Sequence, residues 1–148
     1  MRIAFITLLA AAGLAGLASP AAQAAQTEGC RLSLSAEGET ASFAGTAATR
    51  TAQLVRETGT AFAAAASTLC GAGVVRAAHL QPFSRLLVRN AEGVATPTVY
   101  DDAEQLPGAL IVEYAFAESG APAPAAIESA LRCWRDPERE GCMEEVSP

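Results

Sequence analysis

Apolar residues recur at helical spacing in two regions of the chain. The longer region, residues 47–69, predicts the main helix. Thr46 suits its N-cap position, and Gly71 or Gly73 suits its end. Its apolar stripe consists of Val55, Thr58, Phe62, Ala65 and Leu69, with Leu54, Ala61 and Ala66 beside it. A second stripe at residues 125–134 predicts a short C-terminal helix with Ile127, Ala130, Leu131 and Trp134 on one side.

Alternation of apolar and polar positions predicts strands in the rest of the chain. In chain order these are residues 30–36, 40–44, 74–80, 85–90, 94–100 and 109–117. Residues 90–93 read as a hairpin-type turn, and Pro97 favours an edge position for the strand that contains it. The clearest strand is the last, with Leu110, Val112, Tyr114 and Phe116 on one face.

This order of elements predicts a single α+β domain. We expect an antiparallel sheet of about four to five strands with the long helix packed on one face. The short C-terminal helix follows the sheet, and disulfides staple the fold.

The first residues have the pattern of a secretory signal peptide. Arg2 precedes an apolar run at residues 3–17, and Ala22-Gln23-Ala24 fits a small-x-small cleavage site. A membrane anchor is the alternative, but the run is shorter than the roughly 20 residues that a spanning helix needs. We therefore predict cleavage after residue 24 and export of residues 25–148 to the periplasm or beyond, with no later transmembrane segment.

The four cysteines all follow the predicted cleavage site. An even number of cysteines in an exported chain predicts disulfides, since thiols pair in oxidising compartments. Zinc sites bring their ligands in close pairs, and neither that spacing nor a C-x-x-C motif occurs here. A proline and a glycine between Cys133 and Cys142 favour a local bridge, which leaves Cys30 to pair with Cys70. We expect no bound metal or cofactor.

The charge of the chain argues against one class of partner. The chain has no lysine, ten arginines and a formal net charge of −6. A chain this acidic, without a basic cluster, is poorly suited to bind a phosphate backbone. We therefore expect no nucleic-acid partner.

The segment C-W-R-D-P-E-R-E-G-C carries the first candidate binding residues: Trp134, Arg135 and Arg139. Tryptophan and arginine are the commonest anchors of protein interfaces, and a loop closed by a disulfide loses less entropy on binding. The alternative is that Trp134 completes the apolar stripe of the last helix and belongs to the core.

Arg76, Arg85 and Arg89 are the second set of candidate binding residues. They come from two neighbouring predicted strands and could form a patch for an anionic ligand or an acidic partner loop. The alternative is a solvated sheet face on which arginines pair with Glu92 and Glu113.

No residue is assigned a catalytic role. His79 is the only histidine and lacks a catalytic context such as Gly-x-Ser-x-Gly, and Glu113 reads as a strand residue facing solvent. Asp101, Asp102 and Glu104 lack the spacing of a calcium loop.

These features favour a non-enzymatic, exported interaction module whose partner is a protein or a component of the cell envelope. Two alternatives remain open. The chain could be a small anionic-ligand-binding or hydrolytic domain that uses its sheet face, with His79 or Glu113 lining a cleft. It could also be a structural accessory of an envelope complex.

Overall fold

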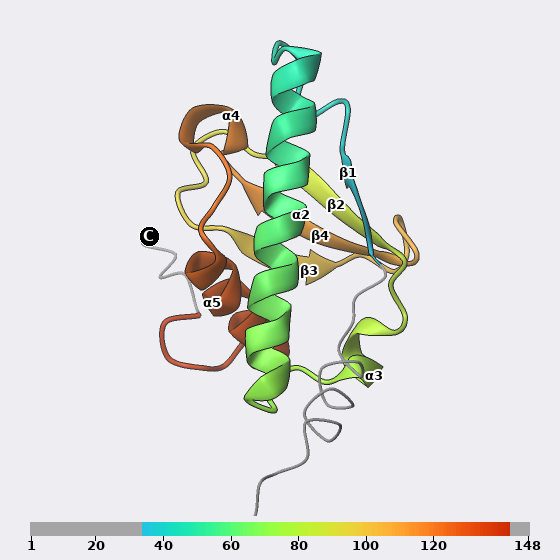
Figure 1. Ribbon diagram of the computed structural model, residues 1–148, viewed down its shortest axis with the longest axis vertical. Helices are drawn as coiled ribbons and strands as arrows, with labels where there is room; N and C mark the ends of the chain where they lie inside the picture. Colours follow the sequence, from blue (N-terminus) through green and yellow to red (C-terminus); the bar gives the residue numbers. More distant parts are fainter. Residues whose placement is uncertain (1–33, 143–148) are drawn as a thin grey trace, which may run out of the picture.

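The computed structural model describes residues 34–142. The predicted signal peptide, Cys30 and the start of the first predicted strand lie outside this range. In chain order the elements are β1 (Ser35–Gly38), α2 (Ala48–Gly71), α3 (Ala77–Leu80), β2 (Arg85–Asn90), β3 (Thr98–Asp101), β4 (Ala109–Tyr114), α4 (Phe116–Ser119) and α5 (Pro124–Arg135) (Figure 1).

The four strands form one mixed sheet in the order β1-β2-β4-β3. β1 runs parallel to β2, and β2 runs parallel to β4; only β3 and β4 are antiparallel. The fold is therefore α+β, as predicted, but the expectation of an antiparallel sheet is wrong.

The connections explain the parallel pairs. Helix α2 returns the chain from the end of β1 to the start of β2, and a crossover of this kind joins parallel strands. β4 then inserts between β2 and β3, so the predicted hairpin turn at residues 90–93 does not join two paired strands.

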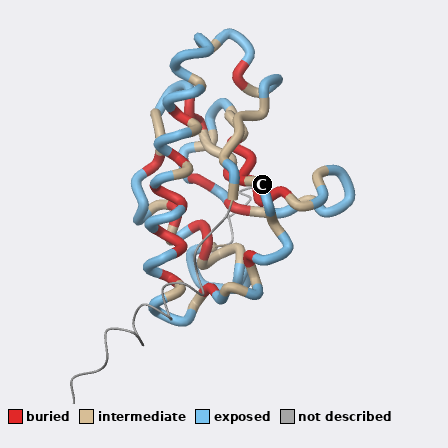
Figure 2. The backbone as a smooth tube through the Cα atoms, turned by 45° about the vertical axis from the view of Figure 1, so that its right-hand side comes forward, coloured by how far each residue is buried: buried red, intermediate tan, exposed pale blue. Residues whose placement is uncertain are grey.

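The main core lies between the sheet and two helices. Figure 1 shows α2 and α5 in front of the same face of the sheet, and buried positions recur along α2 in Figure 2. The buried side chains of α2 are Leu54, Thr58, Ala61, Phe62, Ala65, Ala66 and Leu69. Those of α5 are Ile127, Ala130 and Leu131. The sheet adds Leu86, Val88, Val99, Leu110 and Val112 to the same core.

Gly59 lets α2 lie close to β1. A Cβ atom at this position would stand 3.0 Å from the Cβ of Ala36, closer than two such atoms normally approach. A glycine inside a helix costs about 1 kcal/mol relative to alanine. Here the glycine is explained by close packing between the helix and the first strand.

Several local predictions are wrong. The predicted last strand is too long, because β4 ends at Tyr114 and Phe116 begins α4. Residues 40–45 form turns instead of a strand, and the N-cap of α2 is Ala47 rather than Thr46. The backbone N–H of Thr46 donates to the carbonyl of Phe43 (2.9 Å), so this residue belongs to the preceding turn. Residues 74–80 are not a strand either.

The segment after α2 turns and forms a short helix. The N–H groups of Val74 and Val75 donate to the Leu69 carbonyl at the end of α2 (2.9 and 3.3 Å). His79 then lies in α3, where its N–H donates to the Arg76 carbonyl (2.9 Å).

No helix within residues 34–142 is both long and apolar enough to cross a membrane.

Candidate functional site

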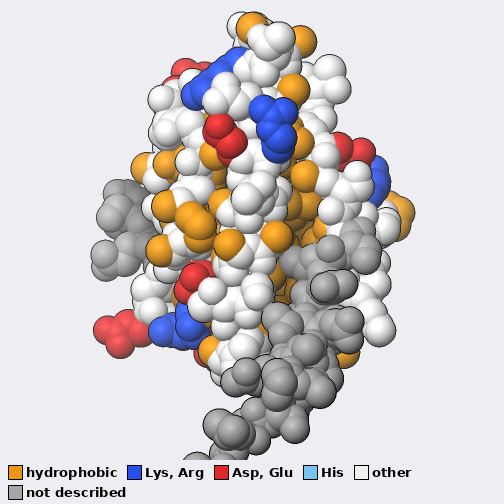
Figure 3. All heavy atoms as spheres, in the orientation of Figure 1, with side chains coloured by type: hydrophobic (Ala, Val, Ile, Leu, Met, Phe, Trp, Pro, Cys, Tyr) orange, Lys and Arg blue, Asp and Glu red, His pale blue; other side chains and the backbone are white. Residues whose placement is uncertain are grey.

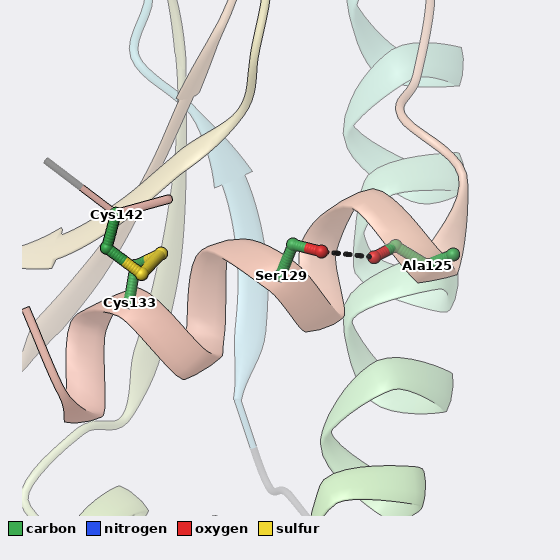
Figure 4. The surroundings of a disulfide bond; sticks show 4 residues. All are labelled: Ala125, Ser129, Cys133 and Cys142. Carbon is green, nitrogen blue, oxygen red and sulfur yellow. Dashed lines mark hydrogen bonds between the residues drawn. A yellow bond between two sulfur atoms is a disulfide. The ribbon is translucent and has the colours of Figure 1, made fainter. Parts of the chain in front are cut away.

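The last turn of α5 is joined to the loop that follows it. Cys133 and Cys142 form a disulfide with a Cα–Cα distance of 5.2 Å, which confirms the predicted local bridge. Figure 4 shows Cys142 lying against the C-terminal part of α5, at Cys133. Cys70 is not a free thiol, but its predicted partner Cys30 lies outside the described residues, so that pairing stays a prediction.

Trp134 is half-buried and held by Asp101 and Phe83. Its indole N–H donates to Oδ1 of Asp101 at the end of β3 (2.9 Å). Its ring meets the ring of Phe83 edge-on, with centroids 5.9 Å apart, and both rings pack against the main core. Trp134 therefore belongs partly to the core and partly to the surface.

Arg135 is exposed and lies over the indole of Trp134, with its guanidinium carbon 5.3 Å from the ring centroid. Its Nη2 atom stands 3.3 Å from Nε2 of His79. No carboxylate of residues 34–142 lies within 4.0 Å of the Arg135 guanidinium. We call Phe83, His79, Trp134 and Arg135 the Trp134 surface.

His79 is fixed by its own helical turn. Its Nδ1 atom accepts the backbone N–H of Arg76 (3.1 Å). Partial burial lowers the pKa of His79 below its ordinary value of 6.5, and the cations of Arg135 and Arg76 lower this pKa further. The neutral form of the imidazole therefore predominates at neutral pH.

The opposite face of the sheet carries two further arginines. Residues 85, 87 and 89 of β2 alternate with Leu86 and Val88, which face the helices. On the open face, Nη1 of Arg85 pairs with Oε1 of Glu37 (2.9 Å). Arg89 pairs with Glu39 through two bonds, Nε to Oε2 (2.9 Å) and Nη2 to Oε1 (2.8 Å).

Tyr100 extends this second pair into a network. Its hydroxyl accepts from Nη1 of Arg89 (2.6 Å) and donates to Oε2 of Glu113 (2.8 Å). Burial raises the pKa of Tyr100, and the hydrogen bond to Glu113 raises this pKa further. We call Glu39, Arg89, Tyr100 and Glu113 the Arg89 network.

A small apolar cluster, Leu87, Ala109 and Ile111, lies on the same face of the sheet as the Arg89 network. Tyr100 and Leu106 pack against it.

The structure separates the predicted binding residues into two groups. Arg85 and Arg89 share the open sheet face, where each is paired with glutamate. Arg76 instead lies beside His79, which brings it near Arg135 of the other predicted set. Arg139 is exposed in the disulfide loop. A binding role for each of these residues stays a prediction.

Sequence reasoning missed several members of both groups. Glu37, Glu39 and Phe83 lie between the predicted elements, and Tyr100 is predicted only as a strand residue. The available signal was opposite charge at alternate positions: Glu37 and Glu39 on one segment match Arg85 and Arg89 on another.

A shallow groove of about 690 Å³ runs between α2 and β1. Its lining residues are Leu34, Ala36, Ala52, Val55, Arg56, Gly59, Thr60 and Ala63. Figure 3 shows hydrophobic side chains on both flanks of α2 on this side of the molecule. Arg56 is the one charged residue in this lining, so the groove brings no acid–base pair together.

Two acidic residues at the end of β3 and just after it accept hydrogen bonds within the fold. Asp101 accepts from the indole of Trp134, and Oδ1 of Asp102 accepts the backbone N–H of Gln105 (3.0 Å). The described part of the chain holds no cluster of three His, Cys, Asp or Glu side chains able to bind a metal ion.

Comparison of the chain with protein-family models, with curated proteins and with solved structures gave no match. A functional assignment therefore rests on the geometry of the Trp134 surface and of the Arg89 network.

Proposed function

We propose that the protein is an exported, non-enzymatic binding module that holds a protein or cell-envelope partner through the Trp134 surface. One observation carries the proposal. An exposed arginine without a carboxylate within ion-pair distance among residues 34–142 lies on a fixed tryptophan beside a disulfide-closed loop.

The rigidity of this surface supports a binding role. Trp134 is held by Asp101 and Phe83, and the Cys133–Cys142 bridge restrains the loop that follows. Each rotamer-rich side chain that is ordered on binding costs about 0.5–1.5 kcal/mol, so a surface ordered in advance binds more tightly. Trp and Arg are also the residue types that most often dominate interface energetics.

The alternative use of the sheet face has less support. Arg85 and Arg89 already bind glutamates there, so an anionic ligand would have to displace a partner that the fold supplies.

Export is part of the proposal as well. The disulfide is compatible with an oxidising compartment, to which the predicted signal peptide would deliver the chain.

The test is a crosslinked pull-down from native envelope extract with the processed, oxidised protein as bait. Two single variants, Arg135→Ala and Arg50→Ala, remove the same charge. Arg50 lies in the first turn of α2, and Arg135 lies beside α3, which follows the other end of that helix. A triple variant with Trp134, Arg135 and Arg139 changed to alanine also removes the indole and the arginine of the disulfide loop.

We expect a partner that the native protein and Arg50→Ala retain and that Arg135→Ala and the triple variant lose. A thermal melt of each variant controls for loss of fold. Equal retention by all four proteins would move the site away from the Trp134 surface, and failure of the native protein to retain any partner would count against a binding module.

A further inference from the structure

The contact between His79 and Arg135 contains a hydrogen-bonding conflict. Nδ1 of His79 accepts the Arg76 backbone N–H, so a neutral ring carries its proton on Nε2. That nitrogen stands 3.3 Å from Nη2 of Arg135, and a guanidinium has donors only. Two donors therefore face each other at the surface.

Changing the protonation of the ring does not remove the conflict. With the proton on Nδ1, this N–H would face the Arg76 backbone N–H at 3.1 Å. A doubly protonated ring would face both donors at once. An oxygen ligand that accepts from both Nε2–H and Arg135 satisfies every group without disturbing the cap of α3.

We propose that His79 and Arg135 together bind a carboxylate, which the partner of the proposed binding module supplies. The inference rests on that proposed function and names the chemistry that the Trp134 surface recognises. A carboxylate has two acceptor oxygens, which match the two donors, and charge-assisted hydrogen bonds of this kind are about twice as strong as neutral ones.

The surroundings favour an anion at this point. Arg76 adds a third basic group beside His79. Asp101, at the end of β3, has an oxygen engaged by the indole N–H of Trp134. The Arg135 guanidinium also lies over the indole face of Trp134. This cation–π contact positions the arginine before a ligand binds.

The chain provides two unique reporters of this site. His79 is its single histidine, and Trp134 is its single tryptophan. In ¹⁵N-enriched protein, the histidine ring ¹⁵N signals therefore belong to His79 alone, and the tryptophan fluorescence belongs to Trp134 alone. Both residues are part of the proposed carboxylate site.

The experiment titrates the processed, oxidised protein with sodium acetate at constant ionic strength, with sodium chloride as balance. At a pH above the ordinary histidine pKa, we expect the free protein to show the Nε2–H form of His79. Acetate should shift the Nε2 signal and the Trp134 fluorescence saturably and in parallel, with a Kd on the order of 10 mM for so small a ligand. Sodium chloride alone should produce no saturable shift.

Three variants make the test specific. Arg135→Gln should abolish the response. His79→Asn keeps an acceptor for the Arg76 N–H but lacks the Nε2 donor, and it should weaken acetate binding about tenfold in the fluorescence titration. Arg50→Gln removes one positive charge at the other end of α2 and should leave binding unchanged.

A native protein that shows no saturable response to acetate, or a response that Arg135→Gln leaves intact, overturns the carboxylate site. The proposed function stands in that event if partner capture still depends on Arg135. Conversely, acetate binding that depends on Arg135, in a protein that retains no partner, supports the carboxylate site and overturns the binding module.

Discussion

Arg89 and Arg135 each contact an aromatic side chain, but the partners of their guanidinium donors differ. The Arg89 side chain is 27% exposed and gives all of its guanidinium nitrogens to Glu39 and Tyr100. Arg135 is exposed, lies on an indole face and points one nitrogen at another donor. An arginine whose donors are satisfied inside the fold supports structure, whereas one whose donors are accessible and unsatisfied can bind a partner.

The largest expected contrast is in stability. Arg89→Ala leaves Glu39 and Glu113 half-buried without their shared cation and should cost about 2–3 kcal/mol of unfolding free energy. Arg135→Ala is the matched variant in the Trp134 surface. It should lower the unfolding free energy by no more than about 0.5 kcal/mol. Urea unfolding measures both. Similar losses in the two variants would remove the distinction between a structural and a binding arginine.

The hydroxyl of Tyr100 tests whether the Arg89 network acts as a unit. Tyr100→Phe removes both the acceptor for Arg89 and the donor to Glu113, and it should destabilise the protein by about 1 kcal/mol in the same urea assay.

Tyr114→Phe is the control, because no residue in the range 34–142 hydrogen-bonds the Tyr114 hydroxyl while its ring packs edge-on against Phe116. This variant should be close to neutral. A neutral Tyr100→Phe would show that the Arg89–Glu39 pair is sufficient alone.

Thr58 is a buried polar residue of helix α2. Its hydroxyl is fully buried and has no hydrogen-bond partner in the described part of the chain, yet no ligand can reach it. Thr58→Val keeps the shape and should raise the unfolding free energy by up to about 1 kcal/mol.

The control for this variant is Thr60→Val, because the exposed Thr60 hydroxyl donates to the Arg56 carbonyl (3.0 Å). It should bring no gain in a thermal melt. A destabilised Thr58→Val would mean that the buried hydroxyl is solvated, and lack of a partner would then be a poor guide to binding sites.

The smallest expected effect is on the titration of His79. Its pKa should lie below 6.5, and Arg135→Gln should raise it because one of the two neighbouring cations is lost. A proton NMR titration of the single histidine measures the shift, with Arg50→Gln as control. An unchanged pKa in Arg135→Gln would show that the two side chains do not interact in solution.

The same shift links stability to pH. A neutral His79 contributes its full stability above pH 6.5, the ordinary value for the unfolded chain. This contribution declines as the pH falls from there through the lowered pKa of the folded state, because the unfolded chain then binds the proton more readily.

Periodicity predicted the two long helices and β2 well, but it gave strand for the short helix α3 and for the start of α4. β2 has the predicted bounds, and α2 and α5 begin and end within two residues of prediction. These segments carry their own signal, since one face of each is buried. The strand predicted at residues 74–80 failed because its two valines complete the end of α2, which local apolar content does not reveal.

Pairing between strands was beyond the reach of local patterns. Asn90 and Gly93 suggested a hairpin, but β2 pairs with β1 and β4. A long helix between β1 and β2 was the available signal for a parallel pair.

For the candidate site, the residue types of Trp134 and Arg135 were enough to single them out in the sequence. Their contacts with Phe83, His79 and Asp101 depend on tertiary packing, which the sequence pattern does not show.

The place of β4 has a consequence for the order in which the chain can fold during synthesis. Of the strands within residues 34–142, β4 is the last to be made, yet it lies between β2 and β3, and β3 pairs with no other strand of this range. A nascent chain that ends before Ala109 therefore cannot fix β3 in the sheet and leaves one edge of β2 unfilled. The complete four-stranded order therefore requires β4, whereas the β1–β2 pair does not.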